Sequence, residues 1–207
     1  MNQNNTTSNT KLGGRDFINI GIFTVIFIVL FMVCIMVMSL TIYTLPFGVA
    51  LASFITASVY MLLRAKAPKA GAITLFGVLF GLVMFVMGSG WPTLAAVIAG
   101  SVIAELVARS GDYKSYTREV AGYCILMLGT AIGSYIPFLV MKDYYLKVAE
   151  KNSINGEFMS RLVEFISGSY LALALAVTIV TAMLGAALAR AVFKKHLVKA
   201  GLLKETK

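Results

Sequence analysis

The only tryptophan of the chain, Trp91, stands in the segment MGSGWPTL at 87–94, which also holds two glycines and a proline. An indole ring offers a large flat surface for stacking and one N–H donor. Ser89 and Thr93 add a hydroxyl group on each side of this ring. These residue types bind flat organic molecules by stacking and hydrogen bonding, so the segment is a candidate binding site.

Further candidate substrate-binding residues are aromatic or charged. They are Tyr43, Tyr135, Lys142, Asp143, Tyr144 and Tyr145. The tyrosines can stack on a ligand ring, and the lysine and the aspartate can pair with its polar groups. The chemistry that these residues share is recognition of a small molecule.

Residue types that most catalytic and metal sites need are scarce. The one histidine, His196, lies near the C-terminus, and Cys34 and Cys124 stand far apart, so no metal site and no bound cofactor are expected. The phosphate-binding pattern G-x-x-x-x-G-K-[ST] and the dinucleotide fingerprint are absent from the sequence. Without a nucleophile and base pair, the chain is not expected to be an enzyme.

The composition indicates which elements position these residues. Of the 207 residues 59% are hydrophobic and 13% are charged, and the mean hydropathy is +0.86, too apolar for a water-soluble domain. Apolar runs of membrane-spanning length predict an all-α membrane protein with six transmembrane helices, since the runs lack the alternation of a β-barrel. The expected spans are 17–40, 46–63, 71–87, 91–108, 120–141 and 170–193.

Three parts of the chain differ in character. We expect a polar N-terminal tail at 1–16, a transmembrane domain at 17–193 and a basic C-terminal tail at 194–207. The first apolar run is too long for a signal peptide, so it is expected to remain as a helix.

The basic residues predict the orientation of the helices. With six spans, the connections on the side of the termini collect all Lys and Arg residues except Lys142, Lys147, Lys151 and Arg161. By the positive-inside rule both termini are then cytoplasmic. The net charge of +9 is thus a topology signal and a contact for anionic membrane lipid, and no nucleic-acid partner is expected.

The connection between helices five and six, at 142–169, is the longest on the outer face. Its segments KDYYLKVAEK and EFMSRLVEF favour two short amphipathic helices separated by a turn. We therefore expect a structured cap over the outer end, with an ordinary extracellular connection as the alternative.

Aromatic residues gather at the outer level of this topology. Besides Trp91 and the candidate tyrosines, the group includes Phe47, Phe138 and Tyr170. A belt of rings at headgroup depth would explain them without a ligand. Gly88 and Gly90, however, predict a tight turn before Trp91, and Pro92 suits the first turn of the next helix.

Two features inside the membrane have alternative explanations. Gly77 and Gly81 form a GxxxG pair, which packs helices together within the chain or against a partner. Glu105 is the candidate intramembrane acid, with Arg109 one turn later. We interpret the two as a structural i,i+4 pair, with a proton or ion relay as the alternative.

Four segments carry a family resemblance. They are KLGGRDFINIGIFTVIFIVLF, LFGVLFGLVMFVMGSGWPTL, AELVARSGDYKSYTREVAGY and LGAALARAVFKKHLVKAGL. Together they resemble the Trep_Strep family of predicted bacterial membrane proteins, which is grouped with the substrate-binding S components of energy-coupling factor (ECF) transporters. The resemblance implies capture of a substrate at the outer connections, delivered with a membrane coupling subunit and two cytoplasmic ATPases.

The resemblance also implies a contact with the coupling subunit. Many S components carry an Ala-x-x-x-Ala pair in helix one for this contact, and here Gly21 and Val25 stand at that spacing. Gly77 and Gly81 are the other candidates for it.

The leading hypothesis is therefore a substrate-capture subunit for a micronutrient: a vitamin, a vitamin precursor or a tetrapyrrole such as haem. The alternatives are an autonomous small transporter or channel and a structural membrane protein without a ligand.

Overall fold

The computed structural model describes residues 12–113, 115–151 and 156–193. Within this part the chain is built from helices and short connections, without a β-strand. The elements are α1 (Gly14–Met38), η1 (Leu45–Phe47), α2 (Gly48–Lys66), α3 (Ala72–Met84), η2 (Phe85–Ser89), α4 (Trp91–Arg109), α5 (Tyr116–Tyr135), α6 (Pro137–Val140), α7 (Lys142–Lys151), α8 (Gly156–Phe165) and α9 (Gly168–Val192).

Six helical stretches are long and apolar enough to cross a membrane. They are Gly14–Met38, Leu45–Lys66, Ala72–Ser89, Trp91–Arg109, Tyr116–Val140 and Gly168–Val192. The all-α architecture with six spans, predicted from the apolar runs, is therefore confirmed.

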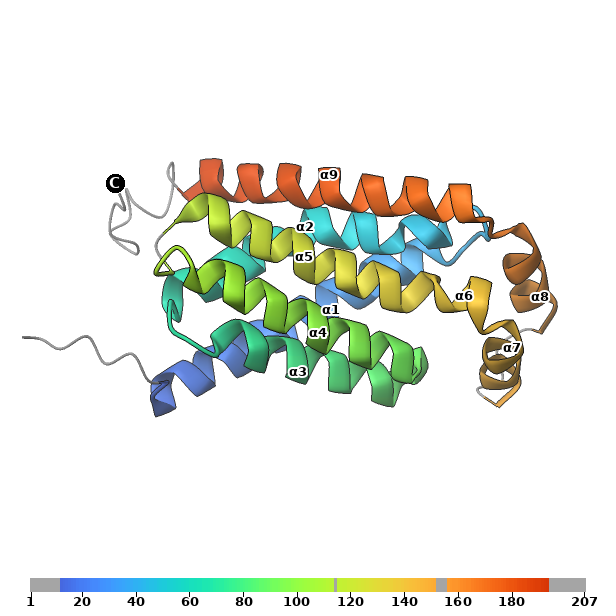
Figure 1. Ribbon diagram of the computed structural model, residues 1–207, viewed down its shortest axis with the longest axis horizontal. Helices are drawn as coiled ribbons and strands as arrows, with labels where there is room; N and C mark the ends of the chain where they lie inside the picture. The colour runs from blue at the N-terminus through green and yellow to red at the C-terminus, as the bar shows by residue number, and fades with distance from the viewer. Residues whose placement is uncertain (1–11, 114, 152–155, 194–207) are drawn as a thin grey trace, which may run out of the picture.

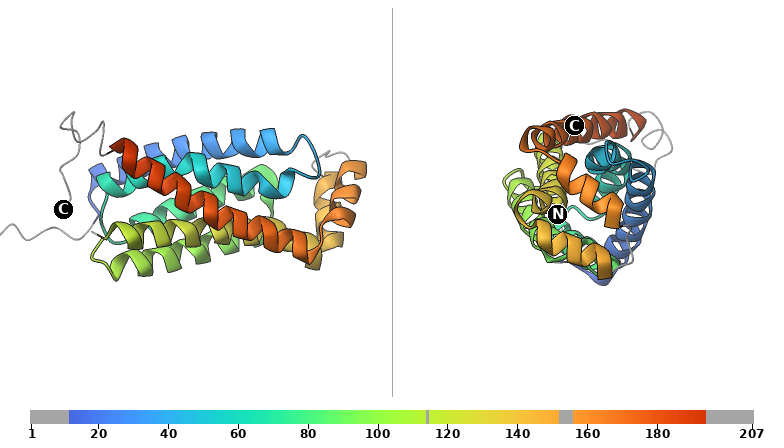
Figure 2. Two further views of the ribbon diagram at one scale, coloured as in Figure 1. Left: turned by 90° about the horizontal axis from the view of Figure 1, so that it is seen from above. Right: turned by 90° about the vertical axis from the view of Figure 1, so that its right-hand side faces the viewer.

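The long helices run side by side along the molecule, and α7 and α8 lie across one end of the bundle (Figures 1 and 2). We call this the capped end. The opposite end, where α1 begins and α9 ends, carries Arg64, Lys66, Lys69, Arg109, Arg118 and Arg190, and we call it the basic end. The structured cap is confirmed, whereas the cytoplasmic position of the basic end stays a prediction.

The spans extend further into polar sequence than the hydrophobic pattern predicts. The second span reaches Lys66 rather than residue 63, and the fifth begins at Tyr116 rather than at residue 120. The reason is a buried ion pair, since Arg64 Nε lies 2.8 Å from Glu119 Oε2. Two charges that neutralise one another can be included in the packed ends of helices.

The first helix also begins earlier than expected. α1 starts at Gly14, within the segment 1–16 that the sequence assigns to the polar tail. Asp16, in the first turn, accepts a hydrogen bond of 2.8 Å from the backbone N–H of Gly13 and thereby caps the helix. Most of both predicted tails lies outside the described residues.

Aromatic rings fill the contact between α1 and α3. Phe27 meets Phe76 edge-on with ring centroids 4.9 Å apart, and Phe31 meets Phe80 in the same way at 5.1 Å. All four side chains are buried. Edge-to-face contacts add specific geometry where apolar burial alone cannot distinguish a helix neighbour from lipid.

Small residues bring other helices close together. A Cβ atom on Gly77 would overlap Ser101 of α4, and one on Gly81 would lie 3.1 Å from Leu94 Cδ1. Both glycines are buried in the contact of α3 with α4. Their small surface is therefore used within the chain, and a role for them in partner contact is not supported.

Candidate functional site

The turn between α3 and α4 has the tight geometry that its glycines predict. Gly88 and Gly90 adopt φ values of +98° and +81°, a region that favours glycine, and Pro92 occupies the first turn of α4. Trp91 begins α4 and its side chain is 52% exposed. The turn therefore holds the indole at the surface of the capped end.

The hydroxyl of Thr93 is hydrogen-bonded within the protein. Thr93 is fully buried, and its Oγ1 lies 2.9 Å from the carbonyl oxygen of Ser89 and 3.1 Å from that of Gly133. A Cβ atom on Gly133 would lie 2.9 Å from Thr93 Cα. Thr93 thus joins the start of α4 to α5, and its hydroxyl is directed to backbone rather than to an open surface.

Tyr135 joins α5 to the connection between α1 and α2. Its hydroxyl donates to the carbonyl oxygen of Leu45 and accepts from the backbone N–H of Val49, both at 3.1 Å. Val49 lies in the first turn of α2, where backbone N–H groups have no partner within the helix. The side chain is buried, and its hydroxyl joins the end of α5 to the start of α2.

Four rings gather where α9 begins, and we call them the outer aromatic cluster: Tyr43, Phe47, Phe165 and Tyr170. Phe165 lies edge-on to Tyr43 and to Tyr170, with centroid separations of 4.9 Å in both cases. Phe47 meets Tyr170 at 5.5 Å, and the Tyr170 hydroxyl donates to the carbonyl oxygen of Tyr43 at 2.5 Å. The cluster thereby links the α1–α2 connection, the end of α8 and the start of α9.

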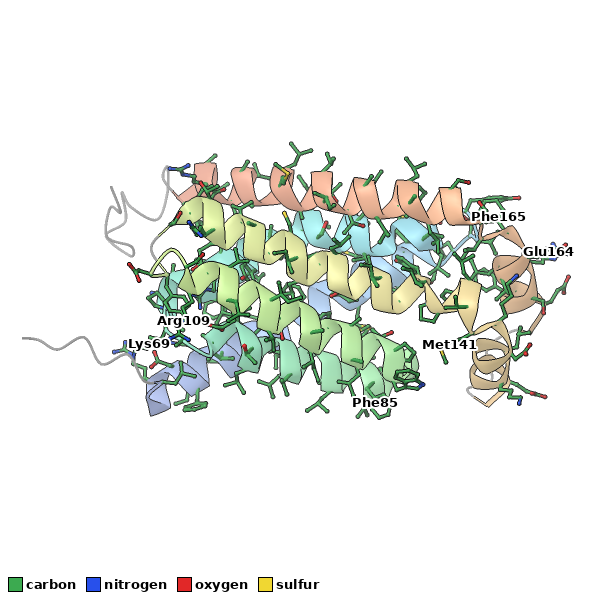
Figure 3. The ribbon with its side chains drawn as sticks, in the orientation of Figure 1. Lys69, Phe85, Arg109, Met141, Glu164 and Phe165 are labelled. Atoms are coloured by element: carbon green, nitrogen blue, oxygen red, sulfur yellow. The ribbon has the colours of Figure 1, made fainter. Side chains whose placement is uncertain are left out.

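The cap is held by Leu162 and Val163 of α8 and by Ile166, which directly follows this helix. All three are buried, while Glu164 points away from the bundle (Figure 3). In α7, Lys142 and Asp143 are exposed. The backbone of Tyr144 and Tyr145 belongs to α7, but the positions of their side chains lie outside the described part of the structure.

The structure thus divides the predicted site residues into separate groups. Tyr43 belongs to the outer aromatic cluster, whereas Trp91 begins α4, on the opposite side of the bundle from the start of α9 (Figure 1). Phe165 was missed by the sequence reasoning. The signal for it was available, because it ends the amphipathic segment EFMSRLVEF on the face that packs.

The predicted contact surface on α1 is open. An added Cβ on Gly21 would meet nothing within 4 Å, and Val25 is 62% exposed. These two residues therefore remain available to lipid or to a partner, unlike Gly77 and Gly81.

The basic end contains a second group of polar residues. Arg64 of α2 donates to both carboxylate oxygens of Glu119, through Nε at 2.8 Å and through Nη2 at 3.0 Å, and its Nη1 donates to the carbonyl of Ala67. The same guanidinium lies 5.2 Å from the ring centroid of Tyr113. Such a bidentate pair fixes the ends of α2 and α5 together.

Glu105 has a different partner from the one predicted. Its Oε2 accepts hydrogen bonds from the backbone N–H groups of Ile73 and Thr74, at 2.8 and 3.1 Å. Arg109 is exposed, and no ion pair joins it to Glu105 in the described part of the chain. The i,i+4 interpretation is wrong because the N-terminal turn of α3 offers two aligned donors and a favourable dipole.

Tyr113 lies in the turn between α4 and α5, outside the membrane-spanning helices, and it is close to both Arg64 and Glu105. Burial raises its pKa to about 12, and the negative charge of Glu105 adds to the effect.

Groups of three or more metal-binding side chains do not occur among the described residues.

Six membrane-spanning helices with a helical cap define a multi-pass integral membrane protein. The profile of the Trep_Strep family, described as hypothetical bacterial integral membrane proteins, matches residues 14–199, and the chain belongs to this family. No curated protein and no solved structure matches the chain.

Proposed function

We propose that the protein is the substrate-capture (S) component of an ECF-type uptake transporter. It would bind a micronutrient at the capped end and deliver it through a coupling subunit and two cytoplasmic ATPases. No enzymatic activity is part of this proposal.

The outer aromatic cluster is the observation that carries the proposal. Tyr43 is 59% exposed although it contacts Phe165, so part of its ring is open to a ligand. Phe165 meets the rings of this cluster edge-on, a contact that tolerates small changes of geometry, whereas Leu162, Val163 and Ile166 hold the same part of the cap in the apolar core. A flat ring that stacks on Tyr43 would thus bind beside the cap.

Two polar side chains of the cap suit a substrate with charged substituents. Lys142 and Asp143 are exposed at the start of α7, which is part of the same cap. Sites of this kind combine an apolar or aromatic wall with a few polar groups that fix the orientation of the ligand. A vitamin, a vitamin precursor or a tetrapyrrole has this combination of a flat ring and polar substituents.

The coupling subunit would meet the open surface of α1 at Gly21 and Val25. A glycine on an exposed face lets a partner helix approach closely, and such faces are common in helix association within membranes. The substitution Gly21→Phe is then expected to abolish copurification of the ATPases while leaving ligand binding intact. Gly14→Phe, at an equally open glycine at the start of α1, is the matched control.

Ligand binding by the purified protein is the direct test. Native mass spectrometry and absorption spectroscopy identify small molecules that copurify, and a thermal-shift panel of vitamins and tetrapyrroles finds those that stabilise the fold. Tyr43→Ala is expected to weaken binding of the stabilising compound by about tenfold or more, because one stacking surface is lost. Phe85→Ala is the matched control, since Phe85 projects from the outer side of the α3 end (Figure 3).

Trp91→Ala distinguishes two roles of the indole in the α3–α4 turn, contact with the ligand and contact with lipid headgroups. A loss of affinity would place the indole in the site together with Tyr43, and an unchanged affinity would assign it to the headgroup region. If no compound of the panel stabilises the protein and no ATPase copurifies, the S-component proposal is wrong. Solute uptake by this chain alone in liposomes would favour the autonomous transporter.

A further inference from the structure

Two arginines lie over a tyrosine ring in the described part of the chain, and they differ in what else they bind. The guanidinium of Arg64 is 5.2 Å from the ring centroid of Tyr113, and that of Arg190 is 4.4 Å from the ring centroid of Tyr116. Arg64 is buried, and its N–H groups donate to Glu119 and to a backbone carbonyl. Arg190 is exposed, and within the described residues it forms no ion pair.

The ring beside Arg190 is fixed in place by a hydrogen bond. Tyr116 begins α5, and its hydroxyl donates to the carbonyl oxygen of Ala186 at 2.8 Å. Ala186 lies on α9 one helical turn before Arg190, so the hydrogen bond holds the ring of Tyr116 against α9 next to the guanidinium. A ring face attracts the cation but supplies no acceptor oxygen, so the N–H groups of Arg190 remain available to an oxyanion.

The acids of the basic end do not neutralise Arg190 in the described structure. Ion pairs with other residues engage Asp16 and Glu119, and the amides of α3 engage Glu105. Asp112 also lies at this end, in the α4–α5 turn, and no ion pair joins it to Arg190. The positive charge of Arg190 is therefore available to a group from outside the described chain.

Arg190 stands where a membrane-spanning helix meets the headgroup level. It lies in the last turn of α9, which forms the sixth span, Gly168–Val192. Ala187 and Met183, three and seven residues earlier, lie on the same face of α9 and are both exposed. This face thus presents a cation at the end of the span and an apolar surface along the span.

We propose that Arg190, held against the ring of Tyr116, binds the phosphate of one anionic phospholipid whose acyl chain lies along Ala187 and Met183. A guanidinium matches a phosphate group in geometry and can donate two parallel hydrogen bonds to it. The single uncompensated charge favours a headgroup of charge −1 over a zwitterionic one, which brings a cation of its own.

The proposal is narrower than the attraction to anionic lipid that the net charge predicts. A general attraction would involve all the exposed cations of the basic end, whereas the ring contact singles out Arg190 among them. The inference does not depend on what the capped end binds.

Native mass spectrometry of the purified full-length protein in a neutral detergent tests the proposal. Phosphatidylglycerol or phosphatidylcholine with the same acyl chains is added in increasing amounts, and the number of bound lipid molecules is measured at each concentration. We expect one molecule of phosphatidylglycerol to bind at a lower concentration than any further lipid and than phosphatidylcholine.

Removal of the charge should weaken binding of this first lipid. Arg190→Gln changes an exposed side chain, so the fold should be kept while the half-saturating concentration of phosphatidylglycerol rises by about tenfold. Arg109→Gln is the matched control, because Arg109 is exposed in the last turn of α4 and lies over no ring in the described structure. This control should leave binding of the first lipid unchanged.

Three further variants separate the shape of the site from its charge. Arg190→Lys keeps the charge but loses the planar guanidinium, and its affinity should fall between those of the parent and Arg190→Gln. Tyr116→Phe keeps the ring and loses the hydrogen bond to Ala186, whereas Tyr116→Leu loses both, so the affinity should fall further in Tyr116→Leu. The Tm of each variant without added lipid measures whether the fold is kept.

Three results would overturn the lipid site. The first is equal binding of phosphatidylglycerol and phosphatidylcholine by the parent protein. The second is an equal loss of binding in Arg190→Gln and Arg109→Gln, which would show a general effect of charge. The third is displacement of the bound lipid by glycerol 1-phosphate at a similar concentration, which would assign the position to free phosphate compounds.

Discussion

The two ends of the helix bundle are held together by different interactions. At the capped end, rings meet edge-on in the outer aromatic cluster, and hydroxyls of Tyr135 and Thr93 bond to backbone groups. At the basic end, the buried contacts involve charges: Arg64 with Glu119, and Glu105 with the amides of α3. The buried contacts between helices are thus mainly neutral at the capped end and mainly ionic at the basic end, while the Arg161–Glu157 pair of the cap is exposed.

This difference predicts that the helices separate less easily at the basic end than at the capped end. Removing one partner of a buried ion pair leaves an uncompensated charge, so helices joined in this way separate only at high cost. Ring contacts lose a smaller amount each and tolerate a change of geometry. The basic end is therefore expected to remain rigid while the capped end adjusts to a ligand.

The largest loss of stability is expected when the Arg64–Glu119 pair is broken. Arg64→Met should lower the free energy of unfolding by about 3–5 kcal/mol, because Glu119 stays buried without its partner. Denaturant titration of the protein in detergent, followed by circular dichroism, measures this loss. The double variant Arg64→Met/Glu119→Leu should recover most of it, and a double variant as unstable as the single one would contradict the charge explanation.

An intermediate effect is expected at Tyr135 of the capped end. Tyr135→Phe leaves the N–H of Val49 and the carbonyl of Leu45 without their hydroxyl partner, so the loss should be about 1–3 kcal/mol. Hydrogen exchange should accelerate locally in the α1–α2 connection, with little change at the basic end. Uniform acceleration along the chain would show that the two ends do not behave separately.

The partly exposed pair of Lys69 with Asp16 tests whether charge alone makes the basic end strong. The Lys69 side chain is 30% exposed, so Lys69→Met should cost only about 0.2–1 kcal/mol. The same denaturant titration at low and high salt measures it, and the cost should shrink as salt screens the pair. A loss as large as that of Arg64→Met would mean that burial is not what distinguishes the two pairs.

The effect with the narrowest range of conditions concerns Tyr113, which titrates only at alkaline pH. Its pKa is raised to about 12 in the folded protein, because burial and the charge of Glu105 disfavour the phenolate. A raised folded-state pKa contributes stability below the unfolded value of about 10, and this contribution is lost as pH rises from there through 12. Absorbance titration near 295 nm of the parent and Tyr113→Phe should differ by one late-titrating phenol, and an ordinary titration near pH 10 would contradict the assignment.

The local pattern of the sequence was sufficient to predict the turn and the short helices of the capped end. The glycines at 88 and 90 predicted the tight turn before Trp91, and two amphipathic segments predicted the helices α7 and α8. These features depend on residues a few positions apart, so periodicity and turn chemistry are enough to find them. The grouping of Tyr43 with Phe165 and Tyr170 was not visible, because Tyr43 stands 127 positions before Tyr170 in the chain.

The basic end shows why local spacing can mislead. Arg109 stands four residues after Glu105 and suggested an i,i+4 pair, yet the carboxylate caps α3 through residues 31 and 32 positions earlier. The partner of Arg64 is likewise 55 residues away in the chain. Which of several possible partners a side chain meets depends on which helix faces pack together.

The sequence by itself determined the six spans and their cap, since an apolar run in lipid must satisfy its own backbone hydrogen bonds and therefore forms a helix wherever it occurs. Three features were decided by the tertiary structure alone. Gly77 and Gly81 pack against α4, the surface at Gly21 stays exposed, and Glu105 bonds to the backbone of α3 rather than to Arg109. Lipid is as apolar as the helix surfaces, so hydrophobicity does not distinguish a buried face from an exposed one. Close packing and pairing of polar groups make that choice, and both depend on the complete bundle.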